Sequence, residues 1–147
     1  DLCNKAMELD PTNVYPKYYI AELLFMKKEF DAARQHYAEL VSFYPSPHFI
    51  EGLFRNTYLN GDKQAAMPYF DQLKALSGQM TIPYVMTRAY ATLGDMDNAL
   101  LNLEEAYSMR DIEVVNLWFD GALDPLRKDP RFQEILTRLE YAGPDPD

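Results

Sequence analysis

Apolar residues recur at helical spacing through most of the chain. After Gly94 they fall at positions i, i+1, i+4, i+7 and i+8, on one face of a helix: Ala99, Leu100, Leu103, Ala106 and Tyr107. Residues 82–93 carry a similar stripe. Between the two segments, Gly94 suits a left-handed helix end and Asp95 suits the N-cap of the next helix. Because the alternation typical of strands is nearly absent, the pattern predicts an all-α fold.

The pattern repeats every 33 residues. Four columns of residues stay in phase over three copies. They are Ala33/Ala66/Ala99, Tyr37/Phe70/Leu103, Leu40/Leu73/Ala106 and Lys28/Gly61/Gly94. Each copy holds two amphipathic segments, and no single hairpin can bury its apolar face alone. We therefore expect stacked helical hairpins.

A repeated helix–turn–helix unit of this length, with small and aromatic residues at fixed places, resembles the tetratricopeptide repeat (TPR) family. The resemblance covers roughly residues 1–108 and implies a right-handed α-solenoid of TPR-like repeats with a C-terminal capping segment. We interpret the chain as a single domain cut from a longer protein. Its parts are the end of a truncated repeat (1–13), three repeats (14–46, 47–79, 80–110), a degenerate repeat or cap (111–142) and a tail (143–147).

The capping segment keeps the period in a weaker form. We expect its large apolar residues to close the open end of the core: Trp118, Phe119, Leu123, Leu126 and Phe132. Asp124-Pro125 and Asp129-Pro130 each resemble an N-cap followed by proline at the first helical position. Residues 120–139 resemble the terminal segment of TPR arrays in large bacterial signalling proteins, which carry winged-helix regulators, nucleotide cyclases or kinases.

Charge and composition narrow the class of partner. The 147 residues are 48% apolar and carry a net charge of −9, which disfavours binding to nucleic acid or to an anionic membrane surface. Cys3 is the sole cysteine, so no disulfide framework and no cysteine-based metal site is expected. No run is long and apolar enough for a membrane span, and no signal-peptide pattern is present. We expect a cytoplasmic location, or a periplasmic one if an upstream segment carries a membrane anchor.

The sequence contains no recognisable catalytic constellation. His36 and His48 lack a second histidine or a cysteine three or four positions away, and residues 95–98 lack the glycine and glutamate of a calcium loop. We therefore expect a protein that is not an enzyme and that holds no cofactor and no metal.

The resemblance implies a peptide-binding groove, because the first helices of TPR units line a concave face. Transferring the family's groove positions to this sequence gives Tyr15, Tyr18, Glu22, Phe25, His48, Glu51, Arg55, Tyr58, Tyr84 and Arg88. Arg55 and Arg88 lie one repeat apart and motivate a ligand with a carboxylate or an acidic side chain. In the structural alternative, Arg55 pairs with Glu51 and Arg88 stacks on Tyr84.

The function predicted on this basis is a non-catalytic protein–protein interaction module that binds a peptide or partner segment on the concave face. The alternative is a regulatory or sensory appendage of a transcriptional regulator, cyclase or kinase. It would act by packing on its own protein or by self-association, so a homodimer stays open.

Overall fold

A computed structural model of the chain describes residues 2–10 and 12–141, and every regular element in that part is helical. The predicted all-α class is therefore confirmed for these residues, while the predicted tail (143–147) lies outside them. The elements are α1 (Leu2–Leu9), α2 (Tyr15–Met26), α3 (Phe30–Phe43), α4 (Pro47–Leu59), α5 (Lys63–Ser77), α6 (Pro83–Leu93), α7 (Met96–Ser108), η1 (Ile112–Asn116), η2 (Gly121–Leu126) and α8 (Pro130–Tyr141).

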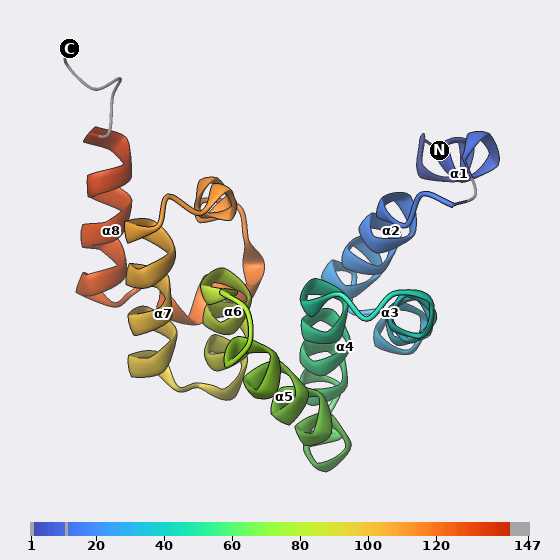
Figure 1. Ribbon diagram of the computed structural model, residues 1–147, viewed down its shortest axis with the longest axis horizontal. Helices are drawn as coiled ribbons and strands as arrows, with labels where there is room; N and C mark the ends of the chain where they lie inside the picture. Colours follow the sequence, from blue (N-terminus) through green and yellow to red (C-terminus); the bar gives the residue numbers. More distant parts are fainter. Residues whose placement is uncertain (1, 11, 142–147) are drawn as a thin grey trace. The chain divides into compact units, whose positions relative to one another are not determined.

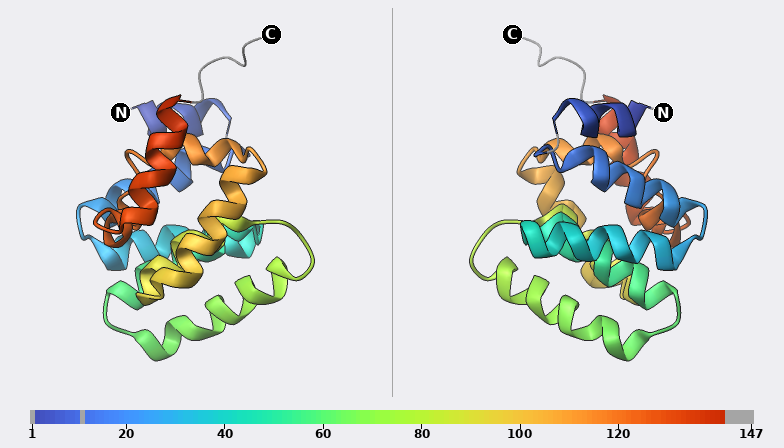
Figure 2. Two further views of the ribbon diagram at one scale, coloured as in Figure 1. Left: turned by 90° about the vertical axis from the view of Figure 1, so that its left-hand side faces the viewer. Right: turned by 90° about the vertical axis from the view of Figure 1, so that its right-hand side faces the viewer.

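The chain divides into two compact units, Asp1–Gly78 and Gln79–Asp147. In the first unit α2 packs on α3 and α4 packs on α5, as two helical hairpins that also contact each other through α3 and α4. In the second unit α6 and α7 form a hairpin (Figure 1; further views in Figure 2). The hairpins coincide with the paired amphipathic segments of the 33-residue pattern.

The turns between paired helices confirm the column at positions 28, 61 and 94. Lys28, Gly61 and Gly94 all have positive φ, at 62°, 102° and 79°, which is the left-handed conformation that ends a helix. The aspartates that follow the two glycines cap the next helices. Asp62 and Asp95 each accept a hydrogen bond from the backbone N–H three residues on, at 3.1 and 3.2 Å.

The second helices bury the small and aromatic columns. The residues at these nine column positions, from Ala33 to Ala106, are all buried. In the first unit, Ala33, Tyr37 and Leu40 of α3 form one core cluster with residues of α2 and α4. Gly52 of α4 lies directly on the Tyr37 ring, where a Cβ atom would stand only 2.3 Å from the ring Cε1 atom. A glycine at this position therefore permits the close approach of α3 and α4.

In the second unit, η1, η2 and α8 cover the α6–α7 hairpin in place of a further regular hairpin. Leu123, Leu126 and Phe132 are fully buried as predicted. The prediction for Trp118 and Phe119 was wrong, because both are exposed. Val114 and Leu117 are buried in the core instead: an interval of three residues brings side chains back to the same face of a 3₁₀ turn.

The two Asp-Pro pairs differ in outcome. Asp129 accepts a hydrogen bond from the Arg131 N–H at 2.9 Å, and α8 begins at Pro130, as predicted. Asp124-Pro125 does not begin an element but lies inside η2. The cap of η2 is Asp120, which accepts a hydrogen bond from the Ala122 N–H at 2.9 Å.

The last helix, α8, lies beside α7 and runs in the same direction (Figure 1). Arg131 pairs with Asp97 at 2.9 Å, and Arg138 pairs with Glu104. The residues of each pair are 34 positions apart in sequence, and equal offsets at two points require parallel helices. These exposed or half-exposed pairs favour this register more than they add stability.

The close approach at Gly52 predicts a sensitive position. Gly52→Ala should lower the free energy of unfolding by about 1–3 kcal/mol, because the added methyl group overlaps the buried Tyr37 ring. Gly78→Ala is the matched control, since a Cβ atom there meets only backbone oxygens at 3.5 Å or more. Urea denaturation of both variants measures the difference. Equal effects of the two substitutions would show that α3 and α4 do not pack in this way.

Candidate functional site

The ten predicted groove residues occupy equivalent positions on the first helices of the repeats. Four lie on α2 and four on α4 in the first unit, and two lie on α6 in the second. We call the eight residues of the first unit the first-helix face: Tyr15, Tyr18, Glu22, Phe25, His48, Glu51, Arg55 and Tyr58. On each helix they are spaced i, i+3, i+7 and i+10, which places them on one side.

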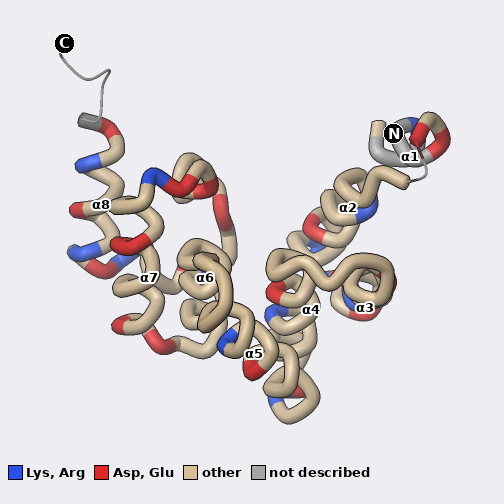
Figure 3. Tube along the Cα trace, in the orientation of Figure 1, with Lys and Arg blue, Asp and Glu red and all other residues tan. Residues whose placement is uncertain are grey.

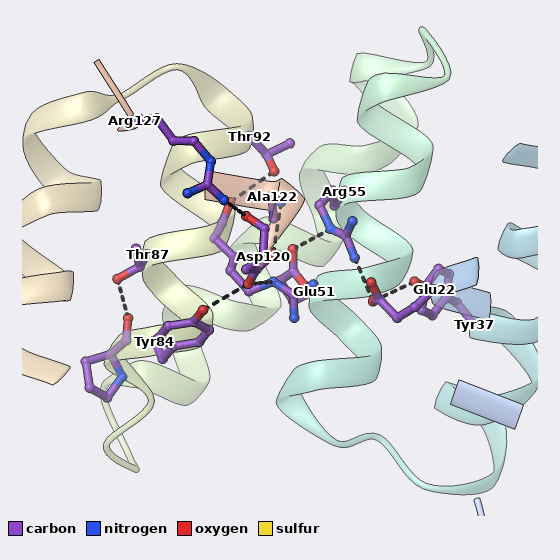
Figure 4. Close-up of polar contacts among 12 residues, drawn as sticks. Glu22, Tyr37, Glu51, Arg55, Tyr84, Thr87, Thr92, Asp120, Ala122 and Arg127 are labelled. Carbon is purple, nitrogen blue, oxygen red and sulfur yellow. Dashed lines mark hydrogen bonds and ion pairs between the residues drawn. The ribbon is translucent and has the colours of Figure 1, made fainter. Parts of the chain in front are cut away.

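Arg55 is the centre of a buried ion-pair network in the first unit. Its Nε donates to Glu51 Oε1 at 3.1 Å and its Nη2 donates to Glu22 Oε1 at 2.7 Å (Figure 4). The exposed fraction of Arg55 is 2% and that of Glu51 is 0%. The predicted structural pairing of Arg55 with Glu51 is thus confirmed.

Glu22 extends this network to a third helix. The same oxygen that binds Arg55 also accepts a hydrogen bond from the Tyr37 hydroxyl at 2.7 Å. The Arg55 guanidinium lies over the Phe25 ring, 4.0 Å from its centroid. Side chains of α2, α3 and α4 are therefore joined around one guanidinium, which fixes the two first helices relative to each other.

The aromatic members of the first-helix face retain accessible surface. Tyr15 is exposed, and Tyr18, Phe25 and Tyr58 are half-buried, as is His48. The Tyr18 ring packs edge-on against Tyr37, which is itself buried, at a centroid distance of 6.4 Å. The accessible surface of this face is consequently mainly aromatic.

In the second unit Tyr84 and Arg88 converge on Asp120. The Tyr84 hydroxyl donates to Asp120 Oδ2 at 3.0 Å, and Arg88 Nε lies 3.4 Å from the same oxygen. Both α6 residues are buried. Sequence reasoning missed Asp120 because it follows the irregular η1 segment, where the 33-residue period gives no information. Its other oxygen caps η2, so one carboxylate connects α6 to the covering segment (Figure 4).

Burial and neighbouring charges shift the pKa of the Tyr37 and Tyr84 hydroxyls. Burial raises the pKa of Tyr37 above its usual range, and the neighbouring Glu22 charge raises it further, while Arg55 opposes the shift. Burial likewise raises the pKa of Tyr84, with a further contribution from Asp120. Both hydroxyls remain protonated donors at neutral pH and hold the carboxylates in place.

The described residues contain no cluster of three or more His, Cys, Asp or Glu side chains that could hold a metal ion. In the same part of the chain, no helix is long and apolar enough to cross a membrane. A comparison with protein-family models found no match, and searches against curated proteins and against solved structures found none either.

Because Arg55 is the cation of the buried ion-pair network, replacing it should lower the stability of the fold strongly. Arg55→Met should lower the free energy of unfolding by about 3–5 kcal/mol, because the Glu22 and Glu51 carboxylates lose a shared partner inside the protein. Arg34→Met, in the exposed pair with Asp31, is the control and should change it by less than about 1 kcal/mol. Chemical denaturation of both variants tests this, and similar losses would reject a structural role for Arg55.

The raised phenol pKa predicts a loss of stability in alkali. Tyr37 keeps its proton in the folded state above about pH 10, whereas the unfolded chain releases it, so stability should fall as pH rises beyond that point. Tyr37→Phe should lose less stability than the native chain between about pH 9 and pH 11. Thermal melts across this range provide the measurement. Parallel curves for the two proteins would contradict the assignment.

Proposed function

We propose that this chain is a non-catalytic protein-interaction module, built as a TPR-like α-solenoid, that binds a peptide or partner segment across the first-helix face. The observation that supports the proposal is the combination on α2 and α4 of accessible aromatic side chains with a buried ion-pair network beneath them. Tyrosine is enriched at binding hot spots, because it offers a large rigid contact area together with one polar group.

The buried network makes such a surface effective. Glu22, Arg55 and Tyr37 fix α2, α3 and α4 through hydrogen bonds of 2.7 Å, so the aromatic residues do not have to be ordered when a ligand binds. Less conformational entropy is then lost on association. A rigid scaffold with an accessible aromatic surface fits a peptide-binding role.

The surroundings of Arg55 and Arg88 make it less favourable for these arginines to bind an acidic ligand. Arg55 and Arg88 are both buried and already contact carboxylates of the chain. A ligand carboxylate could reach them only by replacing Glu22 or Asp120, which leaves a displaced carboxylate behind and reduces the net gain. We therefore propose that the aromatic residues, rather than the arginines, provide most of the contact with the partner.

Selection of peptides from a random displayed library on the purified chain tests this function. The best peptide should lose affinity by about tenfold when Tyr15→Ala and Tyr58→Ala are combined, as expected for removal of hot-spot side chains. Tyr44→Ala is the matched control, because Tyr44 is an exposed tyrosine at the end of α3 that is not part of the first-helix face, and its loss should leave affinity unchanged. Failure to select any peptide, or equal losses in the variants and the control, would refute the proposal.

A further inference from the structure

The segment after α7 presents large apolar side chains to solvent. Ile112, Val115, Trp118 and Phe119 are exposed to 81%, 62%, 37% and 88%, and we call these four residues the η1 patch. Ile112 and Val115 lie three residues apart in η1, and Trp118 follows at the same spacing just after it, while Val114 and Leu117 between them are buried. Several large apolar residues exposed within eight positions, including a tryptophan and a phenylalanine, are typical of interaction sites.

Arg127 holds the segment that carries the aromatic residues. Its guanidinium donates to the backbone carbonyl oxygens of Leu117, Trp118 and Asp120, each at 3.2 Å. Its Nε donates to Asp124 at 2.7 Å. The Arg127 hydrogen bonds thus hold the backbone on both sides of Phe119, and the Trp118 and Phe119 side chains belong to an ordered turn. Such an arrangement reduces the entropy that a partner must overcome on docking.

The surroundings of the η1 patch are acidic. Residues 104–124 contain six carboxylates and Arg110 as the one cation (Figure 3). Glu104, Asp120 and Asp124 pair with Arg138, Arg88 and Arg127, and with these three arginines included the segment still carries a formal net charge of −2, from six carboxylates and four arginines. Asp111 and Glu113 flank Ile112 directly in sequence.

The negative charge around the η1 patch indicates which kind of partner can bind there. A second copy of the chain carries the same net charge of −9, and an anionic bilayer is also negative, so both are repelled. A partner with basic residues beside an apolar face is attracted instead. The described part of the chain contains no β-strand to which an extended peptide could add, so the partner must bind through side chains.

We propose that the η1 patch is a docking surface for a cationic amphipathic helix of another protein. Ile112, Val115, Trp118 and Phe119 receive the apolar side of the helix, and the carboxylates around them receive its lysines or arginines. This surface belongs to the second unit and shares no residue with the first-helix face of the proposed function.

A labelled amphipathic peptide of leucine and lysine, arranged with helical periodicity, is a suitable probe. Fluorescence anisotropy with the full chain at low salt should show binding. A peptide of the same composition in scrambled order, and one with glutamate in place of lysine, should each bind at least about tenfold more weakly. No binding of the first peptide, or equal binding of all three, would overturn the proposal.

Substitutions in the chain locate the site. Phe119→Ser and Ile112→Ser together should weaken binding by about tenfold or more, whereas Phe43→Ser should leave it within about twofold. Phe43 is a matched control because it is 72% exposed at the end of α3. Since all three side chains are exposed, the variants should keep the native circular dichroism and melting temperature. Unchanged binding in the double variant would place the peptide elsewhere and reject the η1 patch.

Sedimentation of the native chain distinguishes the competing occupant. The proposal requires a monomer whose mass does not change with the Phe119→Ser substitution. A dimer that this substitution dissociates would show that a second copy covers the patch, which would overturn the assignment to a cationic helix.

Discussion

A helical hairpin cannot bury its own apolar face, and both units of this chain are arranged around that constraint. In the first unit another hairpin satisfies it: α4 packs on α3, and Gly52 allows close contact with Tyr37. In the second unit η1, η2 and α8 satisfy it with shorter and less regular elements. The same requirement is met in two ways, and the irregular way leaves large apolar side chains on the outside.

The buried charges of Arg55 and Glu51 are the second constraint on how the helices of the first unit pack. Arg55 and Glu51 are almost fully removed from water, which is unfavourable unless each charge is paired and hydrogen-bonded. Hydrogen bonds from Tyr37 and Arg55 to Glu22 meet part of that need and connect three helices. An apolar core of the same volume could be equally stable, so the network is better understood as a device that specifies how α2, α3 and α4 align.

The sequence was informative wherever structure follows the 33-residue period. The hairpins, the repeating column at 28, 61 and 94, the left-handed helix end at Gly94 and the packing columns of the second helices all depend on local spacing, and all were predicted. Residues outside the period were not: aromatic character suggested burial for Trp118 and Phe119, but a 3₁₀ turn directs Val114 and Leu117 inward instead. Asp120 and Arg127 had no periodic signal. Glu22 and Arg55, opposite charges 33 residues apart in one column, were a signal for the ion pair that sequence reasoning overlooked.

The two proposed surfaces use acidic residues in opposite ways. On the first-helix face Glu22 and Glu51 are turned toward Arg55, so their charge is largely neutralised within the chain and contact with a partner falls to aromatic side chains. In the segment of the η1 patch, residues 104–124 with the three arginines that pair with them from outside carry six carboxylates and four arginines, so the segment stays acidic. Dissolved salt screens exposed charges and hardly affects apolar contact. On these two proposals, the first surface should select partners by shape and the second by charge.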